Sequence, residues 1–161
     1  MIAIVITIIM SIMCTVPTSA ASIENSSREI YYVVYDENGA VVEDGIILAN
    51  DNARYSWGSS ITLQNGWYTA FLKPGPESFY VTNGTAMQFS YSLNRNATIA
   101  YKFYQDSSPT NTIYSTVWKS GTSTGKSGCI IKMADKTSYY YVGITNASSD
   151  PITISNVSFV F

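Results

Sequence analysis

The stretch Thr85-Ala-Met-Gln-Phe-Ser-Tyr-Ser-Leu93 decides the fold class of this chain. From Met87 onward its apolar residues occupy every second position and alternate with Gln or Ser. Because successive side chains of a β-strand point to opposite faces, the alternation predicts a strand with one buried face and one wet face. The polar run Asn94-Arg95-Asn96 follows, and residues 97–104 then repeat the alternation. We therefore expect a β-hairpin with its turn at residues 94–96.

Other strand signals extend over the chain on both sides of this hairpin. Nine further segments are enriched in β-branched and aromatic residues, which favour strands. They are residues 29–35, 40–49, 60–64, 67–73, 78–82, 113–119, 129–134, 138–145 and 152–161. Asn-Gly dipeptides at 38–39, 65–66 and 83–84 favour tight turns, because both residues tolerate positive φ angles. The pattern predicts an all-β fold, a two-sheet antiparallel β-sandwich of jelly-roll or Greek-key type, without helices in the mature domain.

The last predicted strand changes the parity of its apolar residues. They occupy even positions up to Ile154 and odd positions from Val157 to Phe161. A β-bulge near Asn156 would bring both sets to the core face.

The first 21 residues are typical of a secretory signal peptide. Residues 2–13 form an apolar run that only Thr7 and Ser11 interrupt, and small residues follow at 18–21. The run is shorter than the roughly 20 residues that a membrane-spanning helix needs. We expect residues 1–21 to be a signal peptide and 22–161 to be a single β-sandwich domain, secreted and without a permanent membrane anchor.

Charged residues make up only 12% of the chain, and the net charge is −2. A nucleic-acid-binding surface needs a basic patch or stripe, and the sequence contains no basic run. Nucleic acid is therefore excluded as a partner.

Cys129 is the one cysteine that remains after removal of the leader, so no internal disulfide can form. Its apolar neighbours predict a buried, unreactive thiol. Secreted domains without disulfides are common among bacterial exoproteins, which favours a bacterial source. Five Asn-x-Ser/Thr sites leave a eukaryotic host open, at Asn25, Asn83, Asn96, Asn146 and Asn156.

The segment 118–128 contains fragments of three catalytic motifs without the context that each needs. Gly121-x-Ser123-x-Gly125 matches a nucleophile elbow, but the chain has no histidine to serve as base. Ser123-x-x-Lys126 matches a serine–lysine dyad, and residues 125–127 match part of a phosphate-binding loop, but both motifs require a helix. We expect a flexible hairpin loop here and a protein that is not an enzyme.

No cofactor is expected, with calcium as the alternative. Carboxylate and amide oxygens suit calcium, but Asp and Asn are also ordinary turn residues. The candidates are Asp36, Glu37, Glu43, Asp44 and the run at residues 50–52.

Thirteen tyrosines and three tryptophans are the unusual feature of the composition. If alternate residues of 113–119 and 138–145 face the core, the aromatic residues between them face outward. Exposed rings beside Asn, Gln and Ser suit a sugar, because the ring stacks on its apolar face and polar groups bind its hydroxyls. The predicted ligand-binding residues are Tyr55, Trp57, Tyr114, Trp118, Tyr139 and Tyr141. The alternative is that these rings fill the core or cover its edges.

Two stretches of the C-terminal half, Ser78-Phe-Tyr-Val-Thr-Asn-Gly-Thr-Ala-Met-Gln-Phe and Tyr139-Tyr-Tyr-Val-Gly-Ile-Thr-Asn-Ala-Ser, are similar to parts of a known family. They resemble the bacterial pre-peptidase C-terminal domains, over residues 78–161. The resemblance implies a jelly-roll-like sandwich that assists or anchors secreted enzymes, with some members binding calcium or matrix protein. It assigns no site residue in this chain.

These features together predict a secreted, non-enzymatic binding module whose ligand is an extracellular glycan or a cell-surface protein. A self-associating matrix subunit or a membrane-active, toxin-like exoprotein is the alternative, because weakly charged strands invite pairing with other chains. A small hydrolase built from scattered acids is less favoured.

Overall fold

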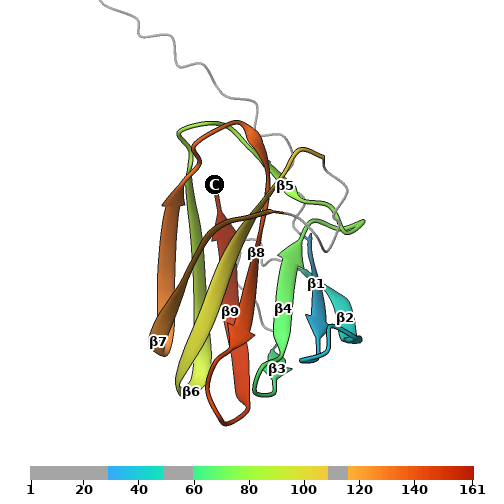
Figure 1. The fold of residues 1–161 in the computed structure, drawn as a ribbon, viewed down its shortest axis with the longest axis vertical. Coiled ribbons are helices and arrows are strands. Elements are labelled where there is room, and N and C mark those ends of the chain that lie inside the picture. The colour runs from blue at the N-terminus through green and yellow to red at the C-terminus, as the bar shows by residue number, and fades with distance from the viewer. Residues whose placement is uncertain (1–28, 49–59, 109–115) are drawn as a thin grey trace, which may run out of the picture.

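The structure is a computed structural model that describes residues 29–48, 60–108 and 116–161 (Figure 1). These residues form nine β-strands and no helix, which confirms the predicted all-β class. The strands are β1 (Glu29–Tyr35), β2 (Val41–Leu48), β3 (Ile61–Leu63), β4 (Tyr68–Leu72), β5 (Phe79–Val81), β6 (Ala86–Asp106), β7 (Thr116–Met133), β8 (Ser138–Asn146) and β9 (Ile152–Val160). In this part of the chain no helix is long and apolar enough to cross a membrane. The predicted signal peptide lies outside the described residues.

Hydrogen bonds join all nine strands into one antiparallel sheet that curls into two layers. The first layer has the order β2-β1-β4-β8-β6-β7, with β5 beside the start of β8. The second layer contains β3, β9, β6 and β7. Residues 99–106 of β6 pair with β8, whereas residues 88–93 pair with β9. The long strands β6 and β7 therefore belong to both layers, as in a β-sandwich.

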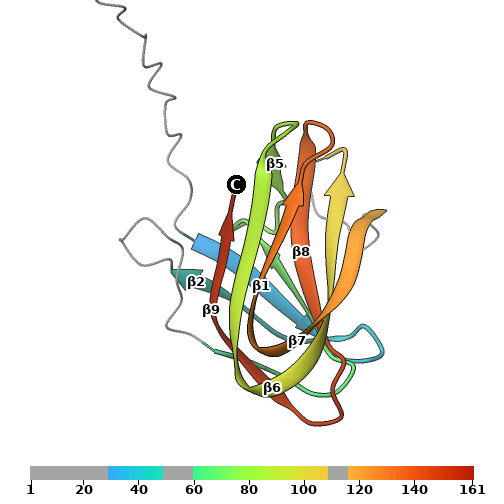
Figure 2. The same ribbon diagram turned by 90° about the vertical axis from the view of Figure 1, so that its left-hand side faces the viewer.

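The predicted hairpin between residues 85–93 and 97–104 is wrong. Strand β6 bends, as Figure 2 shows, but its two halves lie in different layers, because residues 88–93 pair with β9 and residues 99–106 pair with β8. Each half pairs with β7 instead, and the register shifts between Ser92 and Ala97. Pairing with residues 11 to 47 positions later thus replaces the local pairing that the turn signal predicted.

The core lies between the two layers. Phe71 of the first layer packs on Phe89 of the second, with ring centroids 5.5 Å apart. The alternation that starts at Met87 is confirmed, because its four apolar side chains through Leu93 are all buried. Burial of these apolar side chains is the main contribution to the stability of the domain.

Residues 116–133 form strand β7, so the expected flexible loop at 118–128 is wrong. Its glycines have a packing role that the sequence reading missed. A Cβ atom at Gly121 would overlap the ring of Tyr101, and one at Gly128 would overlap the ring of Tyr91. Each tyrosine is the cross-strand partner of that glycine, and its ring covers the backbone where a side chain is missing.

The expected burial of Cys129 is also wrong, because the thiol is exposed. Its neighbour Ile130 takes the core face opposite Phe89, and alternation then places Cys129 on the outer face opposite Ser90.

The three Asn-Gly turns and the bulge near Asn156 are confirmed. Gly39, Gly66 and Gly84 have φ angles of 84°, 77° and 79°. Asn156 has a φ angle of 49°, and the apolar residues of β9 on both sides of it are buried. Phe161 is the exception, since it lies beyond the strand and remains 45% exposed.

Candidate functional site

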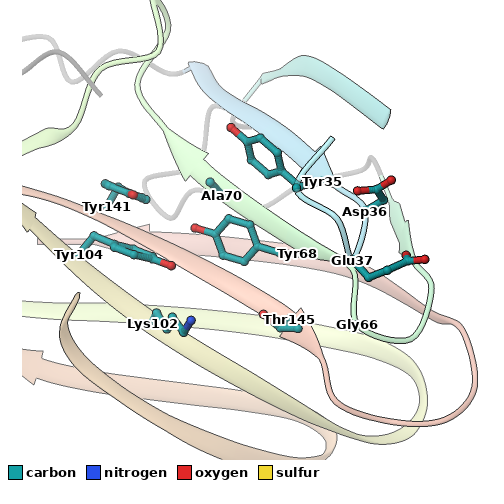
Figure 3. Close-up of a pocket in the computed structure, with 11 residues that line it drawn as sticks. Tyr35, Asp36, Glu37, Gly66, Tyr68, Ala70, Lys102, Tyr104, Tyr141 and Thr145 are labelled. Carbon is teal, nitrogen blue, oxygen red and sulfur yellow. The ribbon is translucent and has the colours of Figure 1, made fainter. Parts of the chain in front are cut away.

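The outer face of the first layer carries a groove lined by tyrosine rings (Figure 3). Four adjacent strands supply one ring each: Tyr35 from β1, Tyr68 from β4, Tyr141 from β8 and Tyr104 from β6. The groove has a volume of about 290 Å³. This is just below the ~300–1,000 Å³ range of ligand pockets.

Register brings these rings together. Tyr35 lies directly opposite Tyr68, and Tyr104 lies directly opposite Tyr141. Directly opposite side chains in antiparallel strands share a face and are close enough to touch. All four rings therefore project from the face that points away from the core, whereas their neighbours Val34, Phe103 and Val142 point into it.

The rings form two pairs that meet at Tyr68. Tyr35 and Tyr68 are stacked with centroids 5.7 Å apart and an angle of 28° between planes. Tyr104 and Tyr141 are stacked more tightly, at 4.4 Å and 6°. Tyr68 meets Tyr104 edge to face at 6.3 Å. Such contacts hold the rings in fixed orientations, so the aromatic surface is formed before any ligand arrives.

Gly143 of β8 provides the space in which Tyr68 lies. A Cβ atom at this position would overlap the Tyr68 ring. Ala70 and Thr145 complete the lining beside it, and both are short enough to leave the ring accessible. Small residues beneath the ring let it lie low on the sheet.

Carboxylates stand at one end of the groove, in the turn between β1 and β2. Oδ1 of Asp36 accepts hydrogen bonds from the backbone N–H groups of Asn38 and Ala40, at 2.9 and 2.8 Å. Oε2 of Glu37 accepts a hydrogen bond from Nε1 of Trp67 at 3.0 Å. Each carboxylate has a second oxygen that can accept a hydrogen bond from a ligand hydroxyl.

Lys102 supplies a donor on the β6 side of the groove, across Tyr68 from Tyr35 (Figure 3). Burial raises the pKa of Tyr68 well above its ordinary value, and the neighbouring Tyr104 and Tyr141 act in the same direction. Burial also raises the pKa of Tyr35. Both phenols therefore stay neutral at physiological pH and can donate hydrogen bonds.

The structure places the predicted ligand-binding residues in four different settings. Tyr141 lines the groove, but it is only 2% exposed because its ring is stacked on Tyr104. Tyr139 lies farther along the same face of β8 and contacts Tyr80, with centroids 5.3 Å apart. Tyr55, Trp57 and Tyr114 lie outside the described residues.

Trp118 lies away from the groove, against the core. Its Nε1 donates a hydrogen bond of 2.6 Å to Oδ2 of Asp135, and its ring meets Tyr140 at 5.3 Å. The expected orientation of this strand is reversed, since Val117 is exposed and Trp118 packs against the core cluster. A register shift in the β6–β7 pairing between Phe103 and Tyr104 accounts for the reversal, because one extra residue exchanges the two faces.

Tyr35, Tyr68 and Tyr104 were absent from the predicted set. Strand alternation could have identified them. Each is adjacent in sequence to a residue that alternation assigns to the core, so each is expected on the outer face. That signal remains weak until it is known which strands are neighbours.

The calcium prediction gains no support from the geometry. Among residues 29–48, 60–108 and 116–161, no three His, Cys, Asp or Glu side chains are grouped closely enough to hold a metal ion. Glu43 and Asp44 instead accept hydrogen bonds from tyrosine hydroxyls. The run at residues 50–52 lies outside the described residues.

No protein-family model and no curated protein matches this sequence, so the resemblance to pre-peptidase C-terminal domains stays a prediction. Solved structures do show similarity. One is the CBM22-1–GH10 part of xylanase 10B from Clostridium thermocellum, complexed with xylohexaose (13% identity, 83% of this chain and 26% of that chain, TM-score 0.41). This chain thus spans about a quarter of the xylanase chain.

Two further similar structures are single modules. The K2 cleaved adhesin domain of Lys-gingipain is 14% identical, with 81% of this chain and 88% of that chain covered and a TM-score of 0.41. CBM86, a low-affinity xylan-binding module from Roseburia intestinalis, is 13% identical, with 80% and 94% covered and a TM-score of 0.37.

Proposed function

We propose that this protein is a secreted, non-enzymatic module that binds an extracellular glycan in the groove formed by Tyr35, Tyr68, Tyr104 and Tyr141. The observation behind the proposal is the platform made by Tyr35 and Tyr68. Their rings are stacked on the outer face of the sheet with centroids 5.7 Å apart, and carboxylates and a lysine line the same groove.

The chemistry of a sugar suits this arrangement. One face of a pyranose ring is lined with C–H groups and packs well on an aromatic ring, whereas its hydroxyls need donors and acceptors around the rim. The platform supplies the aromatic surface. The hydrogen-bonding groups at the rim are Asp36, Glu37 and Lys102. Since acceptors and a donor are both present, a neutral sugar can satisfy the rim without a charge of its own.

Secretion is part of the proposal and rests on the signal peptide predicted at residues 1–21. An exported module would meet polysaccharides outside the cell. The resemblance of residues 78–161 to pre-peptidase C-terminal domains adds a narrower version, in which the module assists or anchors a secreted enzyme.

The direct test is retention of the mature protein, residues 22–161, on a panel of insoluble polysaccharides and on isolated cell walls. Tyr68→Ala and Tyr35→Ala should each weaken retention about two- to tenfold, because one aromatic contact contributes about 0.5–1.5 kcal/mol beyond area burial. Tyr80→Ala is the matched control, since Tyr80 is 54% exposed and lies outside the groove. It should bind like the wild type.

Circular dichroism and urea unfolding would establish that each variant is folded. The proposal fails if folded Tyr68→Ala is retained as well as the wild type. Retention that disappears after protease treatment of the cell walls would identify a surface protein, and not a glycan, as the ligand.

A further inference from the structure

Two long strand edges are unpaired within the part of the chain that the structure describes. β2 pairs only with β1, and β7 pairs only with β6. The other strands with one partner, β3 and β5, have three residues each, and short edges are one way in which proteins avoid unwanted pairing. β2 has 8 residues and β7 has 18, so their free N–H and C=O groups can accept a further strand.

These edges lie on opposite sides of the molecule. β2 ends the first layer, and β7 borders both layers at the other side, as Figure 1 shows. One copy of the chain can therefore use both edges at once without its two partners colliding.

The two edges carry opposite charge. β2 contains Glu43 and Asp44 and no basic residue, whereas β7 contains Lys119, Lys126 and Lys132 and no acidic residue. The acidic groups are held in place, because the hydroxyls of Tyr32 and Tyr31 donate hydrogen bonds of 2.7 Å to Glu43 and Asp44 respectively.

Both edges also expose apolar side chains. β2 exposes Val41, Val42 and Ile46. The half of β7 that belongs to the second layer, residues 127–133, exposes Ile131 and Met133 on its outer face. Exposed apolar groups next to unpaired strand edges are typical of surfaces that bind another chain.

We propose that copies of this chain associate head to tail, with β2 of one copy pairing with residues 126–133 of β7 in the next. Charge selects this arrangement over the two symmetric ones. Pairing β7 with β7 would bring Lys126 and Lys132 of one copy close to the same lysines of the other copy. Pairing β2 with β2 would bring the carboxylates of two copies close together. Only the β2–β7 pair brings opposite charges together. Because the two surfaces differ, the contact is heterologous and links molecules head to tail into a ring or an open chain.

Charge reversal combined with mixing tests this arrangement. Sedimentation velocity at low ionic strength should show a mass that rises with concentration for the wild type. E43K/D44K makes both edges basic, and K126E/K132E makes both edges acidic. Each variant alone should associate about tenfold more weakly or not at all, since two attractive charge pairs become repulsive. An equimolar mixture of the two should associate again, because each variant then meets an edge of opposite charge.

The matched control is K119E/K136E, which changes the net charge as much as K126E/K132E does. Lys119 lies in the other half of β7 and Lys136 in the turn before β8, so this variant should associate like the wild type. The proposal is overturned if the wild type stays monomeric at every concentration, if K119E/K136E loses association as K126E/K132E does, or if the mixture of folded variants stays monomeric. No glycan is present in this assay, so its outcome is independent of the proposed binding groove.

Discussion

The ring of Tyr68 on β4 crosses over Gly143 on β8 and occupies the space that a side chain at position 143 would fill. The two residues are diagonal neighbours, since Tyr68 pairs with Thr145 and Ala70 pairs with Gly143. The platform of the groove thus depends on a residue that contacts no ligand itself. Gly143 determines where Tyr68 lies, and Tyr68 in turn supports Tyr35.

Gly143→Ala should therefore displace Tyr68 and disrupt the groove. Inserting a methyl group at a crowded site costs about 1–3 kcal/mol in the free energy of unfolding, and glycan retention should fall as much as in Tyr68→Ala. Urea unfolding and retention on the same polysaccharide would measure both effects.

Gly121→Ala serves as the control, because its methyl group would displace Tyr101 on β6 in the same way but outside the groove. It should lose similar stability and keep full retention. Equal loss of retention in both glycine variants would mean that retention follows global stability and not the position of Tyr68.

Stability should fall at alkaline pH because of two tyrosines of β1. A hydrogen bond to Asp44 raises the pKa of Tyr31 to about 12, and burial together with a hydrogen bond to Glu43 raises the pKa of Tyr32 to about 12. The unfolded value is 10.0, so the folded state binds these protons more tightly than the unfolded state does. Their contribution to stability is complete below pH 10 and is lost between pH 10 and about 12. Urea unfolding at a series of pH values would show the decline.

The variant Y31F/Y32F cannot ionise at these positions and should decline less steeply over the same range. The other buried tyrosines, Tyr35 and Tyr68 among them, still titrate in this variant and leave part of the decline. An unchanged slope would show that Tyr31 and Tyr32 are not responsible.

Asn146 lies in a glycosylation motif, but its side chain is buried and forms hydrogen bonds within the fold. The side chain is 1% exposed, and its Nδ2 donates to the backbone oxygens of Leu63 and Asp150 at 3.1 and 2.9 Å. Its Oδ1 accepts the N–H of Ser148 at 2.9 Å. Asn146→Ala leaves these partners without their hydrogen bonds and should cost about 2–3 kcal/mol in urea unfolding. Asn83→Ala, at an exposed site of the same motif, should change stability by less than about 0.5 kcal/mol; a comparable loss at both positions would contradict this role for Asn146.

Strand positions and faces could be predicted where apolar and polar residues alternate strictly. Tyr140, Val142 and Ile144 of β8 face the core as expected, because each directly opposes a partner in β4, β5 or β6 without a shift in register. The predictions that failed involve β6 and β7. A Gly- and Ser-rich sequence favours a loop locally, but pairing with β6 along its whole length makes residues 116–133 a strand. That pairing depends on residues distant in sequence, so the local propensity of residues 116–133 could not predict the strand.

The groove was harder to predict than the strands for the same reason. Aromatic residues on the outer face of a strand could be recognised in the sequence, and Tyr141 was among them. Which of them share a surface depends on the order β1-β4-β8-β6, and none of these strands is adjacent in sequence to its neighbour in the sheet. The face on which Trp118 lies could not be predicted either, because a single-residue register shift moves a side chain from one face to the other.

Trp118 is the aromatic residue of β7, and we expect it to stabilise the fold without binding sugar. The ring packs on Tyr140 at 5.3 Å and is held by the hydrogen bond to Asp135, a contact that also lowers the pKa of that carboxyl. Trp118→Ala should lower the free energy of unfolding by about 2 kcal/mol, less than for a fully buried tryptophan because this ring is only partly buried. Retention on polysaccharide should stay unchanged wherever the variant is folded. Loss of retention without loss of stability would move the binding surface to β7 and away from the groove, because Trp118 would then act as a ligand contact and not as part of the core.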